Sequence, residues 1–178
     1  MPVFHINTVH LIGYWRSLAR GALTPPRQAF NPAEVGELLP QVFMLELGAG
    51  ALPFRLAGEF LIDLHGKPLR GLDFQSLFTP GGRRVVTQAA MSALNNPDPT
   101  VLTCDGFSAE GRQLGLEITL APLAGADGRV ERLLGLYQPT SLVARLGGKP
   151  VVEMNARITA GEGRNHLRLV VNDGLRLG

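Results

Sequence analysis

Four histidines and one cysteine are the side chains of this sequence with the widest chemistry, since they can bind metals, carry protons or act as nucleophiles. They are His5, His10, His65, His166 and Cys104, and they have none of the short spacings that zinc sites use. We therefore predict no metal site. A single cysteine also excludes a disulfide within the chain, which agrees with a reducing compartment such as the cytoplasm.

Two Gly-containing segments begin like catalytic or nucleotide-binding motifs but depart from them. Residues 48–53 read Gly-Ala-Gly-Ala-Leu-Pro and lead into a predicted strand, whereas a dinucleotide-binding loop must open a helix. Ser108, within residues 106–110, lacks the second Gly of a nucleophile elbow. No phosphate-binding Gly-x-x-x-x-Gly-Lys-Ser/Thr segment occurs in the sequence. We therefore predict no catalytic residue and do not expect an enzyme.

Charge and composition exclude further classes of protein. The chain has 178 residues, of which 45% are apolar and 18% charged, and its 22 Gly and 13 Pro indicate one domain with many turns. Basic residues outnumber acidic ones by only 17 to 15 and are scattered, so we expect no nucleic-acid partner. No apolar run approaches the roughly 18 residues of a membrane span, and no signal peptide is visible. We expect a cytoplasmic protein that does not bind a membrane.

Residues 1–40 are predicted to form an N-terminal helical flank. Residues 8–20 carry one apolar stripe at helical spacing, with Asn7 or Thr8 as its cap, and Asn31 followed by Pro32 is a typical helix start. The stripe can pack on the rest of the chain or form a dimer contact, and both interpretations stay open. The dimer-interface candidates on this stripe are Leu11, Ile12, Trp15 and Leu18.

The middle of the chain combines short strands with helices. Two apolar segments around a Gly-rich turn predict a hairpin, with Phe54 and Leu56 on the same face of its second strand. Helical segments follow, and then three strands joined by Gly- and Asp-containing turns. We expect an α+β fold with a five-stranded antiparallel sheet and helices on one face. The predicted strands are residues 42–47, 52–56, 100–107, 113–122 and 131–138, and the predicted helices are residues 59–64, 73–78 and 83–94.

This order of elements, together with short local motifs, resembles the PAS sensory domain. The motifs are Leu-Pro-Gln-Val-Phe at residues 39–43, Phe-Arg-Leu-Ala-Gly at 54–58, and the segment 61–71 followed by Asp-Phe at 73–74. With Trp15 and Pro-Arg at residues 26–27, the sequence is similar to a bacterial branch of nearly stand-alone PAS proteins. The resemblance implies strand order 2-1-5-4-3 and a cavity between the sheet and the helical middle. It also implies a signalling module that dimerises, often through the helix before the core.

The resemblance also bears on the cofactor, which we leave as unknown. Haem-binding members of the family use a His on the long middle helix, but residues 83–94 contain none, and His65 lies earlier in a turn. Light-sensing flavin members use a Cys within Asn-Cys-Arg-Phe-Leu-Gln on a helix, whereas Cys104 lies in a predicted strand. We therefore expect haem and photoactive flavin to be disfavoured.

Aromatic and basic side chains of the predicted core give candidates for the ligand pocket. Five phenylalanines fall in elements that would face the cavity, although aromatic residues also build ordinary cores. Two arginines near the helical wall could anchor a carboxylate or phosphate, or could be surface charges. The ligand-pocket candidates are Phe54, Arg55, Phe60, Arg70, Phe74, Phe78 and Phe107.

Residues 142–178 form a basic C-terminal extension beyond the PAS-like core of residues 41–141. Residues 151–158 and 165–172 predict two strands of a hairpin, which must pack on the core, pack on a second chain or stay loose. The extension is too short for a kinase or a DNA-binding domain, so we expect a separate effector chain, such as a histidine kinase. The predicted function is a homodimeric sensory module that binds a small ligand, a signalling protein or both. The alternative is a protein-interaction adaptor with a filled cavity and no ligand.

Overall fold

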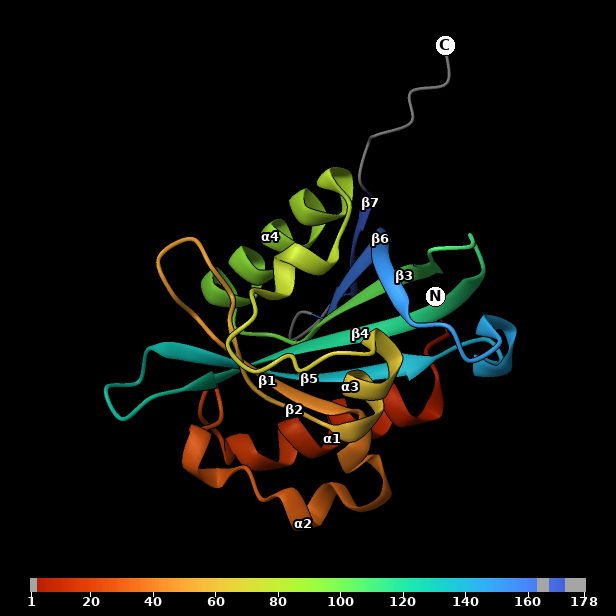
Figure 1. Cartoon of the computed structure of the whole chain (residues 1–178). Coiled ribbons are helices and arrows are strands. Elements are labelled where there is room, and N and C mark those ends of the chain that lie inside the picture. The colour runs from red at the N-terminus through yellow and green to blue at the C-terminus, as the bar shows by residue number, and fades with distance from the viewer. Residues whose placement is uncertain (1–2, 163–166, 172–178) are drawn as a thin grey trace.

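A computed structural model describes residues 3–162 and 167–171, whose centre is one antiparallel sheet (Figure 1). Side chains are described as far as residue 156. The sheet has seven strands in the order β2-β1-β5-β4-β3-β6-β7. The predicted order 2-1-5-4-3 is confirmed, and β6 and β7 extend the sheet beyond the five strands expected. The strands are β1 Val42–Glu46, β2 Phe54–Ala57, β3 Thr100–Ser108, β4 Gln113–Ala124, β5 Val130–Pro139, β6 Val151–Glu162 and β7 Leu167–Val171.

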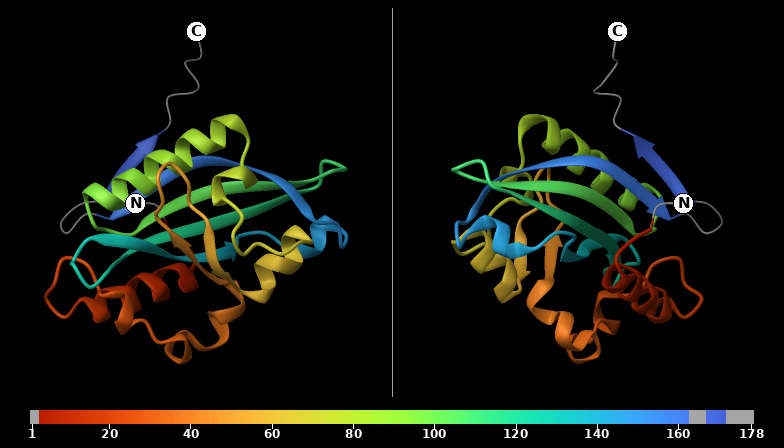
Figure 2. Two further views of the ribbon diagram at one scale, coloured as in Figure 1. Left: turned by 60° about the vertical axis from the view of Figure 1, so that its left-hand side comes forward. Right: turned by 90° about the vertical axis from the view of Figure 1, so that its right-hand side faces the viewer.

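Helices cover both faces of the sheet. The helices are α1 Ile6–Ala19, α2 Pro32–Val35, α3 Glu59–His65 and α4 Pro80–Asn95, with short 3-10 turns η1 Arg27–Ala29, η2 Gly36–Gln41, η3 Phe74–Leu77 and η4 Val143–Leu146. Figure 2 shows α1 and α4 on opposite sides of the sheet. We call the face under α3 and α4 the inner face and the face under α1 the outer face. None of the helices in the described part of the chain has the length and apolar character needed to cross a membrane.

The central strand β4 shows how the sequence creates these two layers. Leu114, Leu116, Ile118 and Leu120 alternate along it, belong to the inner core, and have no exposed surface. The residues between them face α1, and the outer core includes Ala121 and further residues of β1 and β5. Because α1 covers the outer face, β4 is buried on both sides.

Helix α1 uses its apolar stripe to pack on its own sheet. Leu11 and Trp15 belong to the outer core, together with Val42 and Leu136. The indole N–H of Trp15 donates to the Pro122 carbonyl at 2.7 Å, which places the ring against β4. The helix begins at Ile6, with His5 rather than Asn7 or Thr8 as its cap.

The C-terminal extension joins the inner core through β6, which pairs with β3 along most of its length. Leu146, Val151, Met154 and Ala156 belong to the same core as the middle helices. On the edge of β6, the Met154 carbonyl accepts a hydrogen bond from the backbone N–H of Thr79 at 2.8 Å. Of the predicted second strand of the hairpin, Leu167–Val171 pairs with β6, and the remainder of residues 165–172 lies outside the described residues.

One local prediction in β2 is wrong. Phe54 is buried, but Leu56 is 41% exposed, so the two residues do not share a buried face. A β-bulge displaces the pairing between β1 and β2 at Met44 and Leu45, so that Leu45 pairs with Phe54 and Met44 with Leu56. Since neighbouring residues of a strand face opposite sides, the bulge places Leu56 on the face opposite to Phe54.

Candidate functional site

A cluster of aromatic rings lies on the inner face, between the sheet and the helical middle. Phe43 of β1 contacts Phe74 in a stacked arrangement at 5.5 Å and Tyr137 of β5 edge-to-face at 5.4 Å, measured between ring centroids. Phe54 and Phe78 complete the cluster through Phe74, at 5.6 and 5.1 Å. All five rings are almost completely buried. We call these five residues, together with His65, the inner site.

His65 brings hydrogen-bonding chemistry to this apolar site. It is the last residue of α3, where Gly66 ends the helix in the left-handed conformation. Its Nε2 lies 3.3 Å from the Tyr137 hydroxyl, and its Nδ1 lies 3.1 Å from the Val151 carbonyl oxygen. The side chain is buried. His65 therefore connects β5 to the first residue of β6 through the two nitrogens of one ring.

Burial decides the protonation state of His65. Removal from water lowers the pKa of the imidazole to about 4, while the bond to Val151 acts in the opposite direction and the charge of Lys67 lowers it further. The ring is therefore neutral at pH 7. Since the Val151 carbonyl can only accept, we assign the single ring proton to Nδ1. Nε2 then accepts a hydrogen bond from the Tyr137 O–H.

Tyr137 is the second polar group of the inner site. Its side chain has no exposed surface, and burial raises the pKa of its hydroxyl well above the usual value, with a further contribution from Cys104 on β3. The hydroxyl therefore keeps its proton and acts as a donor. Cys104 is itself buried and forms no disulfide. Within the described residues, no group of three or more His, Cys, Asp or Glu side chains could hold a metal ion.

The structure separates the predicted pocket residues into three groups. Phe54, Phe74 and Phe78 lie together in the inner site, and Phe60 packs against the same core while partly exposed. Phe107 is half-buried, and strand alternation from Cys104 places it on the outer face. Arg55 and Arg70 are exposed at the surface.

Sequence reasoning missed three members of the inner site, namely Phe43, His65 and Tyr137. The sequence places His65 in a turn, before the helix on which a haem ligand is expected, and gives no sign of its burial. The alternation of residues 131–138 could have indicated Tyr137, because it places this residue on an apolar face of the strand, where its hydroxyl is the polar group.

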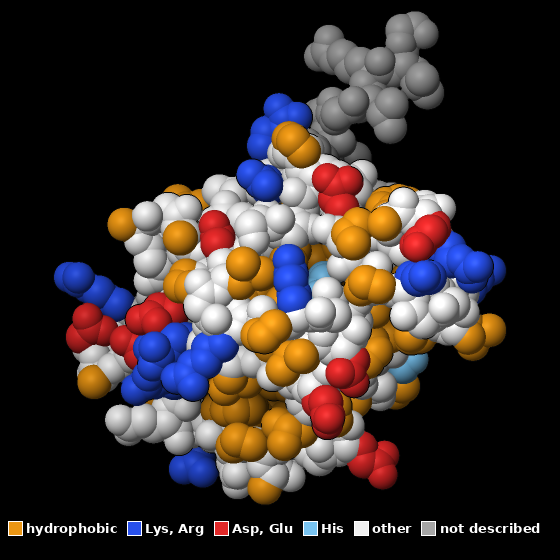
Figure 3. Space-filling model, in the orientation of Figure 1, with side chains coloured by type: hydrophobic (Ala, Val, Ile, Leu, Met, Phe, Trp, Pro, Cys, Tyr) orange, Lys and Arg blue, Asp and Glu red, His pale blue; other side chains and the backbone are white. Residues whose placement is uncertain are grey.

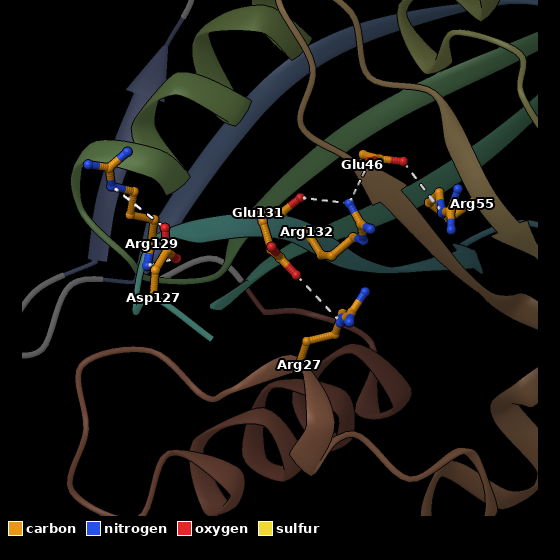
Figure 4. A network of polar contacts seen from close by, with 7 residues as sticks. All are labelled: Arg27, Glu46, Arg55, Asp127, Arg129, Glu131 and Arg132. Atoms are coloured by element: carbon orange, nitrogen blue, oxygen red, sulfur yellow. Dashed lines mark hydrogen bonds and ion pairs between the residues drawn. The ribbon is translucent and has the colours of Figure 1, made fainter. Parts of the chain in front are cut away.

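Arg55 takes part in a network of ion pairs rather than in the inner site (Figure 4). The Glu46 carboxylate lies 3.0 Å from Arg132 and 3.4 Å from Arg55, so one acid joins β1, β2 and β5. Glu131 contacts Arg27 at 3.5 Å and ties the segment before α2 to β5. On the face drawn in Figure 3, basic and acidic side chains are interspersed with apolar ones.

The dimer-interface candidates on α1 lie mostly inside the chain. Leu11, Ile12 and Trp15 are between 1% and 4% exposed, so they have little surface to offer a second copy in this conformation. Leu18 is half-buried and borders a surface hollow of about 570 Å³ at the end of α1. The rest of the hollow includes Arg20, Ala22, Pro26, Ala29 and Glu34, and it has no aromatic wall.

Comparisons with known proteins give a family and a fold. A family model described as PAS domain matches residues 3–138. The dark structure of the LOV domain of the blue-light photoreceptor Aureochrome1 is 14% identical, with a TM-score of 0.50, and the match covers 65% of this chain and 87% of that one. A structure from work on a flavin analogue in a light-oxygen-voltage domain is 15% identical, with a TM-score of 0.48, covering 61% and 82%. An RNA-binding light-oxygen-voltage receptor is 19% identical, with a TM-score of 0.48, covering 72% of this chain and 36% of that one. A search of curated proteins finds no match.

The similarity to the Aureochrome1 domain corrects the expectation about flavin. That expectation disfavoured a photoactive flavin because Cys104 lies in a strand, as the structure confirms. A structural neighbour with this fold, however, is the light-oxygen-voltage domain of the blue-light photoreceptor Aureochrome1. The position of a cysteine bears on a covalent bond to a cofactor and not on whether an aromatic-lined site can hold one. The expectation was therefore wrong to disfavour flavin on that ground.

Proposed function

Because the chain belongs to the PAS domain family, we propose that it is a sensory module whose inner site takes up a small ligand and whose surface passes this event to an effector protein. The proposed ligand is largely apolar and carries one hydrogen-bonding group. The proposal includes a cytoplasmic location, a homodimer, and a separate effector chain such as a histidine kinase.

The buried pair of His65 and Tyr137 within the aromatic cluster is the observation that carries this proposal. Ligand sites are mostly apolar and use a few well-placed polar groups to orient the bound molecule. The inner site has this composition, with five aromatic rings around one imidazole and one hydroxyl. A buried polar pair in an apolar core brings a desolvation cost, so its presence agrees with a role in recognition.

Native mass spectrometry of the purified full chain, compared with its denatured mass and its absorption spectrum, tests the proposal. We expect a non-covalent adduct in the native spectrum that disappears on denaturation. An absorbing adduct identifies a chromophore, and a colourless one identifies a metabolite. The variant Tyr137→Phe keeps the ring but removes the hydroxyl, and we expect it to reduce the adduct. Tyr14→Phe removes the same group from a ring that packs against the outer core and serves as the matched control. A clean unliganded mass for the wild type, also after exposure to a cell extract, would contradict the proposal.

A second candidate function is a protein-interaction adaptor without a ligand, and the close packing of the rings favours it. The ring of Phe74 contacts that of Phe43 at 5.5 Å and that of Phe78 at 5.1 Å, as in the filled core that an adaptor would have. An adaptor would retain an unliganded mass and bind a partner protein. The same spectra therefore discriminate between the two functions.

A further inference from the structure

His65 contacts Tyr137 of the inner site with one ring nitrogen and the first residue of β6 with the other. Nε2 faces the Tyr137 hydroxyl at 3.3 Å, and Nδ1 faces the Val151 carbonyl at 3.1 Å. A neutral imidazole has one proton, so it can donate from only one of these nitrogens at a time. The two contacts of His65 are thus chemically linked.

We propose that His65 reports the state of the inner site to β6 by exchanging its tautomer. This inference rests on the proposed ligand-binding function and names how that binding is transmitted. The ligand class it requires is a molecule with a hydrogen-bond acceptor, such as a carbonyl oxygen, that takes the place of the Tyr137 hydroxyl at Nε2.

The chemistry of the exchange follows from the proton count. In the empty state the proton is on Nδ1, and Nε2 accepts from Tyr137. When an acceptor of the ligand faces Nε2, this nitrogen must carry the proton, and exchange with water removes the proton from Nδ1. The ring stays neutral, with one proton lost at Nδ1 and one gained at Nε2. Nδ1 and the Val151 oxygen are then two acceptors in contact, so their hydrogen bond is lost.

The start of β6 is the element that this loss releases. Val151 begins the strand, and its side chain packs tightly over Gly106 of β3. Two backbone carbonyls in this part of β6 accept hydrogen bonds from the helical middle. The Val151 carbonyl accepts from His65, and the Met154 carbonyl accepts from the backbone N–H of Thr79. Within the described residues, the pairing of β7 with β6 covers residues 158–162 and does not reach the first residues of the strand. Without the His65 bond, the backbone of residues 151–153 is held by its pairing with β3, and the Val151 side chain by its packing in the inner core.

Two substitutions reproduce the two tautomers without a ligand. In His65→Asn the side-chain amide N–H lies near the position of Nδ1 and can still donate to Val151. In His65→Gln the terminal amide lies near Nε2, so the Val151 carbonyl loses its donor. The first variant represents the empty state and the second the occupied state.

Hydrogen–deuterium exchange of the full chain measures the expected release. We expect the backbone amides of residues 151–154 to exchange about tenfold to a hundredfold faster in His65→Gln than in the wild type. His65→Asn should stay close to the wild type. Equal exchange in His65→Gln and the wild type, or equal acceleration in both variants, would overturn the proposal.

The nitrogen NMR signals of the wild-type imidazole provide a measurement that does not depend on any variant folding. We expect the proton on Nδ1 in the unliganded protein, and a proton on Nε2 would overturn the proposal. These measurements distinguish ligand binding at the inner site from the relay through His65. Failure of the proposed function appears as a missing adduct in native mass spectrometry, whereas failure of the relay appears as the wrong tautomer or unchanged exchange at β6.

Discussion

Acidification from about pH 7.5 to about pH 5 is expected to destabilise the protein through His65. The pKa of this imidazole is about 4 in the folded chain, against 6.5 for an unperturbed histidine. As the pH falls below 6.5, His65 becomes protonated in the unfolded chain but stays neutral in the folded chain. The stabilisation from keeping His65 neutral is thus complete above pH 6.5 and is lost as the pH falls towards 4.

The size of the effect follows from the difference between the two pKa values. The full difference corresponds to roughly 3 kcal/mol of unfolding free energy. Of this, about 2 kcal/mol is lost by about pH 5, because the unfolded histidine is by then almost fully charged. That is a large fraction of the stability of an ordinary domain.

Urea unfolding of the wild type and of His65→Asn, followed by the fluorescence of the buried Trp15, measures this loss. The wild type should lose about 2 kcal/mol more than the variant between the two pH values. The comparison uses the change with pH in each protein, so the cost of the substitution itself cancels. The pH effects of all other groups also cancel, because both proteins share them. Equal losses in the two proteins would refute the burial of a neutral His65.

Four substitutions test the packing of the two layers by urea unfolding. Gly135→Ala should cost about 3 kcal/mol, because its Cβ would overlap the ring of Phe43. Gly13→Ala, in the open middle of α1, should instead add about 0.5–1 kcal/mol, and a loss there would contradict the assigned helix. Trp15→Phe removes the donor of a buried carbonyl and should cost about 1–3 kcal/mol, so an unchanged stability would mean that this hydrogen bond is absent. Met154→Ala should cost about 2–5 kcal/mol if β6 belongs to the core, and a neutral result would argue against that placement.

The sequence predicted the elements that depend on local patterns. The period of two from Leu114 to Leu120 identifies the inner-facing residues of β4 without any knowledge of its neighbours, whereas the burial of its other face depends on α1. The start of α2 was equally clear, since the Asn31 side chain accepts from the Ala33 N–H as a helix cap should. Alternation and capping act over a few residues, so one sequence is enough to recognise them.

Features that depend on pairing between distant segments escaped the sequence reasoning. The exposure of Leu56 results from a bulge opposite Met44 and Leu45. No residue type within β2 indicates that a bulge occurs there. The position of Met154 in the core likewise depends on the pairing of β6 with Gly106 of β3. Register is a relation between two strands, and a one-residue shift changes the face of every side chain.

The inner site shows why the extension and the core cannot be considered separately. His65 was interpreted as a turn residue because it stands beside Gly66, but its burial depends on partners 72 and 86 positions later in the chain. One of these partners, Val151, lies beyond the predicted core boundary at residue 141. A chain shortened at that boundary would lack the carbonyl that holds the proton of His65 on Nδ1, and it would also expose the surface that Met154 covers. A search for the ligand therefore requires the chain through β6, because a shorter one would present a different tautomer to the inner site.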